Sequence, residues 1–403
     1  MSPHSLLVST PQGPSGNLFK EDTAYLFGYT GAEPATAISL TMPNRAAQYS
    51  SVALHPVFQM NLPEGFMLEE LRNRLAKVMQ LDPMLLLSIS GGDAAIGRLK
   101  VDGSWLQLPG QTVTQLRGER LSDLLSWDGA ESIFEDLVDR YILRAGISGV
   151  QPKVLVPEVV DSTPAKATVV TQDLIVKSGR EQFPGLAANE FLCMSIAKEA
   201  GLPVPEFFLS RNHALFVMRR FDRTPSGQAI GFEDMAVLMG RGADKKYEGS
   251  YAAVAKVIRL FASPEHVQKS LGELFDSVAL SCMVGNGDAH LKNFGLLYGD
   301  PSTPDCRLAP AFDIVNTTAY FPKDVLALDL GGSKALFPSR QNLLDFATRC
   351  DVKRPLERIE HLLNAAEVVL SREIEVAESV PHVVTAIKRG TSLFEKTFLG
   401  TTA

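Results

Sequence analysis

The sequence predicts an α+β fold with two lobes behind a β-rich leading segment. Short apolar and aromatic runs, punctuated by Gly and Pro, fill residues 1–60. Strand-like and helix-like runs then alternate between residues 153 and 218, and from about residue 230 the apolar spacing becomes helical. Because 403 residues are too many for one small core, two or three packed units are expected.

The leading segment combines strands with one clear helix. Leu6–Val8 and Ala24–Tyr29 are predicted strands. Apolar residues recur at helical spacing over Leu68–Met79, which predicts a helix there, and Ser132–Ile142 predicts another.

The middle of the chain reads as strands, a helix and a further strand. Lys153–Val156, Leu174–Lys177 and Ala214–Met218 are predicted strands. Leu186–Ala200 is a predicted helix, closed by Gly201 at the position where left-handed backbone commonly ends a helix. This order is typical of the small lobe of a kinase.

The last part of the chain is predicted to be helical. One apolar stripe runs straight into a polar loop at Asp288, and it consists of Leu271, Leu274, Phe275, Val278, Ala279 and Cys282. Residues 340–395 predict further helices. We therefore expect three parts: 1–125, a leading subdomain; 126–225, a smaller lobe; and 226–403, a helical lobe.

Composition excludes several classes of function. The net charge of −7 argues against a chain that binds nucleic acid by itself. Four cysteines lie far apart without a C-x-x-C pair, which favours a reducing cytoplasm over a zinc or disulfide framework. No apolar run reaches membrane-spanning length, so no membrane partner is expected.

The most informative segment is residues 285–316. Asp288 precedes Asn293 by five positions, and Asp313 follows in an Ala-Phe-Asp triplet. Protein kinases use this order: an Asp accepts the hydroxyl proton, and an Asn and a later Asp hold Mg²⁺ on the nucleotide phosphates. Each residue alone is ordinary in a turn or cap, but the combined spacing predicts a kinase.

Lys177 and Glu190 form a second candidate pair. Lys177 ends an apolar strand that would deliver one ammonium into a cleft, and an ATP-dependent transferase needs such a cation on the phosphates. Glu190 on the following helix is a candidate partner. The alternative is that Lys177 is a solvated strand end, as most lysines are.

A Gly-containing turn over Ala145–Lys153 is a candidate phosphate loop. Gly146 and Gly149 permit a tight turn whose backbone N–H groups would face phosphates. It matches neither common Gly-rich phosphate motif, and such turns are frequent. A second Gly-rich segment, Gly91–Gly97, is interpreted as a structural turn.

Together these segments resemble the HipA family of bacterial serine/threonine kinase toxins along most of the chain. The matching segments are Gly28-Tyr29, Ile38–Pro43, Phe58–Gly65, Ser148–Lys153, the strand of Lys177, Arg220–Arg223, Glu233–Met235, Gly287–Phe294 and Ala309–Asp313.

The resemblance implies a two-lobed protein-kinase-like fold: an N-terminal β-rich subdomain, a mixed α/β N-lobe and an all-α C-terminal lobe. It implies ATP and Mg²⁺ as cofactors, Asp288 as the base, and Asn293 and Asp313 as metal ligands. The ATP-binding residues that it implies are Ser148, Gly149, Val150, Gln151, Lys153, Lys177, Arg219, Arg220, Phe221, His290 and Lys292, with the backbone of Arg219–Phe221 meeting the adenine.

The resemblance also implies partners. Family members phosphorylate serine in protein targets, typically an aminoacyl-tRNA synthetase, so that translation and growth stop. A small helix-turn-helix antitoxin neutralises the toxin and supplies most DNA contacts, so DNA would be met only indirectly.

One position departs from the family. The loop serine that family members commonly autophosphorylate is replaced by Gly146, and Ser148 is the only serine left in the loop. Ser148 is therefore the candidate regulatory phosphosite, because a phosphate there would repel the ATP phosphates. The alternative is that Ser148 only hydrogen-bonds its own turn.

Two other functions stay open. A small-molecule kinase of the aminoglycoside-phosphotransferase type shares the D-x-x-x-x-N spacing of catalytic Asp and metal-binding Asn. Transfer of phosphate to a small alcohol would identify it. A catalytically weak, DNA-bound co-repressor is the non-enzymatic alternative, which a test of Mg·ATP binding would separate.

Overall fold

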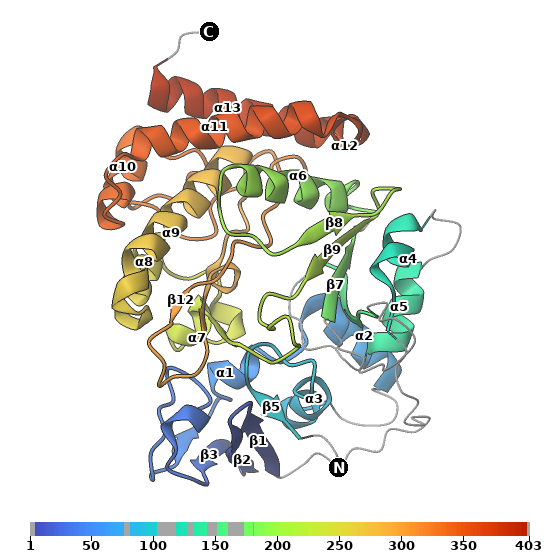
Figure 1. The fold of residues 1–403 in the computed structure, drawn as a ribbon, viewed down its shortest axis with the longest axis vertical. Helices are drawn as coiled ribbons and strands as arrows, with labels where there is room; N and C mark the ends of the chain where they lie inside the picture. The colour runs from blue at the N-terminus through green and yellow to red at the C-terminus, as the bar shows by residue number, and fades with distance from the viewer. Residues whose placement is uncertain are drawn as a thin grey trace.

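The computed structural model describes residues 5–75, 81–102, 118–127, 133–142, 151–159, 173–179 and 181–400. An N-terminal sheet lies at one end of the long axis and a group of helices at the other, with a second sheet between them (Figure 1). The second sheet and the helices form the two lobes that the sequence predicts.

The N-terminal sheet has five antiparallel strands in the order β4-β3-β2-β1-β5. They are β1 (Ser5–Thr10), β2 (Gly13–Glu21), β3 (Ala24–Tyr29), β4 (Tyr49–Ser51) and β5 (Lys100–Val101). Side chains alternate along β1, so Leu6 and Val8 are buried while Leu7 is exposed. The predicted strands at Leu6–Val8 and Ala24–Tyr29 are confirmed.

Three helices lie between β4 and β5 in the chain: α1 (Pro56–Gln59), α2 (Gly65–Leu75) and α3 (Pro83–Ser90). Phe58 of α1 packs in the sheet's core, which also contains Phe232, Val237 and Leu297 from the C-terminal lobe. The predicted helix over Leu68–Met79 corresponds to α2, and its last residues lie outside the described ranges. The N-terminal unit therefore shares a core with the rest of the protein.

The second sheet is antiparallel, with the order β6-β7-β9-β8. Its strands are β6 (Lys153–Pro157), β7 (Asp173–Ser178), β8 (Phe207–Leu209) and β9 (Leu215–Arg219). The packed helices are α2, α4 (Leu121–Ser126) and α5 (Ile133–Tyr141) on one face, and α6 (Leu186–Glu199) on the other. Alternation along β7 turns Leu174 and Val176 toward α5 and leaves Lys177 on the α6 face.

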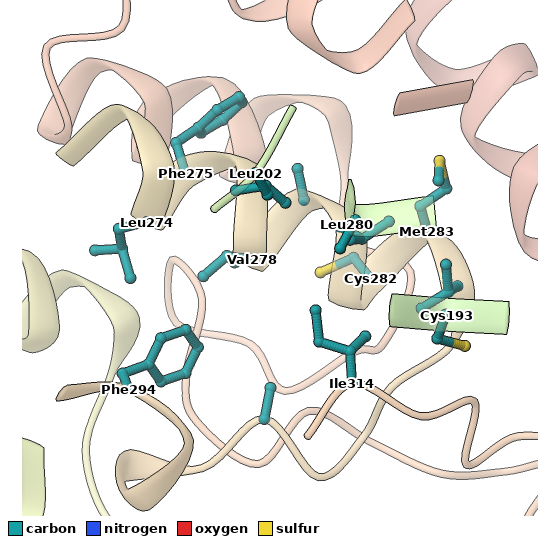
Figure 2. Close-up of a cluster of buried hydrophobic side chains, with 14 of the residues drawn as sticks. Cys193, Leu202, Leu274, Phe275, Val278, Leu280, Cys282, Met283, Phe294 and Ile314 are labelled. Atoms are coloured by element: carbon teal, nitrogen blue, oxygen red, sulfur yellow. The ribbon is translucent and has the colours of Figure 1, made fainter. Parts of the chain in front are cut away.

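The C-terminal lobe is mainly helical. Its helices are α7 (Met235–Leu238), α8 (Tyr251–Phe261), α9 (Pro264–Val284), α10 (Arg340–Arg349), α11 (Pro355–Arg372), α12 (Ile374–Ser379) and α13 (Pro381–Phe394), followed by a π-helical turn at Glu395–Leu399. Figure 2 shows Leu274, Phe275, Val278 and Cys282 of α9 inside the main core. The apolar stripe predicted from the sequence is thus the buried face of α9.

The C-terminal lobe, predicted to be all-α, also contains a small sheet. Strands β10 (Gly231–Asp234), β11 (Gly295–Tyr298) and β12 (Arg307–Leu308) pair antiparallel in that order. Each is only two to four residues long, so none shows a two-residue period in the sequence. The sheet matters because β11 follows the polar loop of Asp288 directly.

The predicted three-part division at residues 125 and 225 stays a prediction. Within the described ranges, no helix is both long and apolar enough to cross a lipid bilayer.

Candidate active site

A cleft of about 630 Å³ is lined by the second sheet, the helical lobe and the N-terminal unit. Apart from Arg219 and Glu190, the candidate partner of Lys177, every described residue that the sequence predicts for the site lines it. These residues are Gln151, Lys153, Lys177, Arg220, Phe221, Asp288, His290, Lys292, Asn293 and Asp313. Residues that lie up to 162 positions apart in the chain (Gln151 and Asp313) therefore meet in one place.

The end of α9 sets the loop of Asp288. The helix stops at Gly285, whose φ of 78° is left-handed and therefore suits glycine. The Asn286 N–H returns to the Ser281 carbonyl at 2.7 Å, and the Asn286 side chain accepts from the Asp288 N–H at 3.0 Å. Because α9 is buried on the core side, the loop begins from a rigid support.

Asp288 and Asn293 are joined through the backbone. The Asp288 carbonyl accepts from the His290 N–H and from the Asn293 Nδ2, both at 2.8 Å. The amide nitrogen of Asn293 is thereby occupied, and its Oδ1 is the atom that remains for a cation. Five residues apart in sequence, the two side chains are positioned by one turn.

The carboxylate of Asp288 accepts a hydrogen bond from the Tyr247 hydroxyl at 2.8 Å. Burial raises the pKa of Asp288 above its ordinary value, and the hydrogen bond from Tyr247 partly offsets that rise. A carboxylate with a raised pKa is a stronger proton acceptor, which suits general-base chemistry.

Lys177 forms two buried ion pairs. Its Nζ lies 2.5 Å from Glu190 Oε1 and 2.7 Å from Asp313 Oδ1, and the lysine side chain is 3% exposed. Burial would lower the pKa of Lys177, but the negative charges of Asp313 and Glu190 outweigh burial and raise it. The predicted contact between Lys177 and Glu190 is confirmed.

Asp313 is held in an uncommon conformation. Its φ of 59° is left-handed, which is rare for a residue other than glycine. The following segment is fixed because Asn316 donates to the Val284 carbonyl at 2.6 Å and exchanges two hydrogen bonds of 2.8 Å with Asn189. Burial would raise the pKa of Asp313, but Lys177 and Lys153 hold it well below its usual range.

Lys153 is a buried cation beside this pair. It lies opposite Lys177 across the β6–β7 ladder and is 6% exposed. Burial lowers the pKa of Lys153, and the charge of Asp313 only partly opposes this. No described residue forms a hydrogen bond or ion pair with its ammonium.

In the segment predicted to meet adenine, Arg219–Phe221, the backbone N–H groups differ in what they bind. The N–H groups of Arg219 and Arg220 donate to the Glu206 and Asp173 carbonyls, so both serve the second sheet and its edges. The side chain of Arg219 pairs with Glu158 at 2.6 Å and does not line the cleft. The N–H of Phe221, by contrast, donates to no backbone carbonyl of the described residues.

Arg220 has a structural role in addition to its place in the lining. Its guanidinium pairs with Asp222 at 2.7 Å and donates to the carbonyls of Ala94 and Ala95 at 2.8 and 2.6 Å. Asp222 in turn accepts from the Gly97 N–H at 2.7 Å. The Gly91–Gly97 segment is thus a structural turn, as predicted, and it is bound to the connection between the lobes.

Lys292 and His290 are two further polar residues that line the cleft. The Lys292 ammonium donates to Glu64 Oε1 of the N-terminal unit at 2.6 Å. His290 Nδ1 is buried without a hydrogen-bond partner among the described residues, and burial lowers the pKa of the ring to about 3. His290 is therefore neutral at physiological pH.

The predicted phosphate loop is described only at its end. Ser148, Gly149 and Val150 lie outside the described residues, as does Gly146, so the loop and the Ser148 phosphosite stay predictions. Gln151 follows the loop, lines the cleft and donates to the Ser178 carbonyl at 3.5 Å.

Several residues that line the cleft were not predicted from the sequence, among them Glu64, Ile96 and Tyr247. Glu64 lies within one of the segments that resemble the HipA family, which was the only available signal. Ile96 lies in the Gly91–Gly97 segment, which was interpreted only as a structural turn, and Tyr247 belongs to no motif. Only the folded chain brings them to the cleft.

The residues present fit a magnesium nucleotide. The buried Lys153 ammonium has no partner among the described residues, and burying a charge without a partner is costly unless a ligand supplies one. The described residues contain no group of three His, Cys, Asp or Glu side chains arranged for a metal. Mg²⁺ at nucleotide sites needs only one or two protein ligands, because phosphates and water supply the others.

Curated relatives resemble parts of this chain. "Putative kinase Y4dM" of Sinorhizobium fredii is 31% identical over 51% of this chain and 55% of its own length. A Haemophilus influenzae protein named "Putative kinase" is 34% identical over 46% of this chain and 57% of its own length. The chain thus matches little more than half of these two relatives. "Putative kinase Y4mE" of S. fredii is 26% identical over 87% of this chain and 86% of its own length.

One solved structure shares the fold along almost the whole chain. It is HipA of the Shewanella oneidensis toxin–antitoxin system, in complex with HipB and operator DNA. It superposes with a TM-score of 0.67 at 17% identity and covers 98% of this chain and 97% of that one. At this identity the likeness shows the fold.

Two family models match the sequence itself. The HipA N-terminal domain model matches residues 6–102. The HipA-like C-terminal domain model matches residues 145–371, which is more than half of the chain and includes all ten predicted residues that line the cleft. The chain belongs to the HipA family.

Proposed function

We propose that this protein is an ATP- and Mg²⁺-dependent serine/threonine protein kinase. One observation supports this most: a single cleft combines a half-buried carboxylate, Asp288, with a lysine, Lys177, that is paired to a second carboxylate, Asp313. Phosphoryl transfer needs these three groups in one place, because catalysis consists mainly of positioning and charge stabilisation.

Each residue has a distinct part in the proposed reaction. Asp288 accepts the proton of the attacking hydroxyl, and Lys177 and Lys153 hold the nucleotide phosphates. Asp313 and Asn293 hold Mg²⁺, which neutralises phosphate charge when it is bound. The Phe221 backbone orients the adenine, and Glu190 keeps Lys177 in place.

We further propose that the kinase is the toxin of a toxin–antitoxin system. Family membership and the shared fold with a HipA that binds HipB support a HipB-like, helix-turn-helix partner. The net charge of −7 supports DNA contact through that partner rather than directly. The proposed target is serine in a protein, with an aminoacyl-tRNA synthetase as the candidate and the cytoplasm as the place.

Induced expression of the chain alone in a bacterium tests this function. The wild type should stop growth, and new phosphoserine peptides should appear in the proteome. Asp288→Ala should restore growth and remove those peptides. Asp345→Ala is the matched control, because Asp345 is exposed on α10 outside the cleft.

Two results would count against the proposal. Equal toxicity of wild type and Asp288→Ala would show that phosphoryl transfer does not cause the arrest. Growth arrest with an unchanged phosphoproteome, but with a phosphorylated small alcohol, would favour the small-molecule phosphotransferase instead.

A further inference from the structure

Tyr247 makes the one side-chain hydrogen bond to the Asp288 carboxylate among the described residues. Its hydroxyl donates to Asp288 Oδ1 at 2.8 Å, and no other hydrogen bond or ion pair reaches that carboxylate from them. Tyr247 lines the cleft together with Asp288, Asp313 and Lys334. The proposed base is therefore already hydrogen-bonded to a hydroxyl group.

The hydrogen bond between Tyr247 and Asp288 has the geometry expected between a general base and the hydroxyl of a substrate. A general base must lie about 2.6–3.2 Å from the oxygen whose proton it takes, and a serine hydroxyl and a tyrosine hydroxyl present the same O–H donor. We propose that Tyr247 is a pseudo-acceptor, whose hydroxyl occupies the place on Asp288 that the hydroxyl of the protein substrate takes and leaves it when that substrate binds. The inference rests on the proposed function and specifies how the acceptor side of the same cleft is controlled.

The surroundings of Tyr247 allow the side chain to move. It is 44% exposed, and its ring contacts His290 edge-on, with the centroids 5.1 Å apart. The Tyr247 carbonyl accepts from Lys334 Nζ at 3.2 Å, which holds the backbone rather than the ring. Rotation of the side chain therefore requires no rearrangement of a core.

A purely structural tyrosine nearby, at the start of α8, looks different. Tyr251, four residues further on, is fully buried, and its hydroxyl donates to the Ala289 carbonyl at 3.1 Å. It thereby supports the same loop from inside the core. Tyr247 instead approaches from the solvent side, and its hydroxyl donates to the carboxylate that has to accept a proton from the substrate.

Tyr247→Phe in the full chain tests the proposal. The acceptor probe is an arrayed set of peptides, each with one serine, with Mg·ATP labelled on the γ-phosphate. The kcat/KM for peptide should rise about 3- to 10-fold through a lower KM, the size expected for one partly exposed hydrogen bond to a carboxylate. Tyr49→Phe is the control, because it removes a tyrosine hydrogen bond, to the Pro43 carbonyl, outside the cleft.

A binding measurement without nucleotide separates competition from other effects. Tyr247→Phe should bind a serine peptide more tightly than the wild type does, and should bind the matching alanine peptide equally well. An equal gain for both peptides would overturn the proposal, because the gain would not involve Asp288.

Kinetics can overturn the proposal in two further ways. An unchanged kcat/KM would show that the contact does not compete with the acceptor. A fall in kcat of more than about tenfold at constant KM would make Tyr247 a residue that positions the base. If the wild type transfers phosphate to no peptide or protein, the proposed function itself fails, whereas transfer without any effect of Tyr247→Phe removes only the pseudo-acceptor.

Discussion

At the level of single residues, the site depends on how the ammonium of Lys177 is shared between two carboxylates. Lys177 lies between Glu190 and Asp313, and only Asp313 also faces the cleft. Glu190 is fully buried, its Oε2 has no partner among the described residues, and burial raises its pKa. Glu190 therefore draws Lys177 toward the α6 side and leaves Asp313 partly free for a cation.

Glu190→Gln should weaken catalysis without removing the base. The amide keeps the shape but loses the charge, so Lys177 should move toward Asp313 and away from the position in which it holds phosphate. We expect transfer to fall about 10- to 100-fold, the cost of a misplacement near the reacting groups. Steady-state kinetics at varied ATP would measure it, with Glu206→Gln as control, because Glu206 pairs with Arg219 outside the cleft. Wild-type kinetics in Glu190→Gln would show that the pair does not position Lys177.

At the scale of elements, each part of the site is fixed by the end of a strand or helix. Strand β7 delivers Lys177 by its two-residue alternation, and α9 ends in the turn that places Asp288. The connection after β9 is held by Arg220 and Asp222, which are both buried and bound to the Ala94–Gly97 segment. The two lobes are thus joined by a connection whose charged side chains, Arg220 and Asp222, pair with each other.

Asp222→Asn should destabilise the fold. Burial would raise the pKa of Asp222, but Arg220 and Arg223 outweigh it and lower the pKa to about 2. Removing one partner of a buried pair typically costs about 3–5 kcal/mol. Because the folded pKa is depressed, this stabilisation is present above the unfolded pKa of about 3.9 and is lost as the pH falls toward 2.

Urea unfolding at pH 7 and near pH 3 would measure both effects. The difference between wild type and Asp222→Asn should be full at pH 7 and smaller near pH 3. The exposed pair of Asp93 with Lys100 supplies the control, and Asp93→Asn should change stability by less than about 0.5 kcal/mol. A difference for Asp222→Asn that does not vary with pH would refute the assigned electrostatic cause.

At the scale of the whole molecule, the N-terminal unit is bound to both lobes. Glu64 pairs with Lys292 beside Asn293, and Ser39 donates to the buried Glu233 at 2.6 Å. The Ala94–Gly97 segment holds the connection between the lobes. The leading part of the chain is therefore part of the cleft and of its frame.

Sequence reasoning succeeded where the signal is local. The apolar stripe of α9 and the alternation around Lys177 are repeated patterns within one element, and the spacing of Asp288 and Asn293 lies within one turn. It missed contacts between distant segments. Glu64 reaches Lys292 across 228 positions, and Tyr247 reaches Asp288 from a loop without a motif. The strands of the small sheet are too short to show a period.

The role of this cleft in phosphoryl transfer is tested most directly by measuring transfer of labelled γ-phosphate from Mg·ATP to protein by the purified full chain. An extract of bacterial proteins is the acceptor, and wild type, Asp288→Asn and the exposed control Asp345→Asn are compared at matched concentration. The wild type and Asp345→Asn should label serine at similar rates, and Asp288→Asn should be slower by a factor on the order of 10²–10⁴. Labelling by Asp288→Asn at the wild-type rate, in a variant shown to be folded, would contradict the assignment of this cleft as the site of phosphoryl transfer.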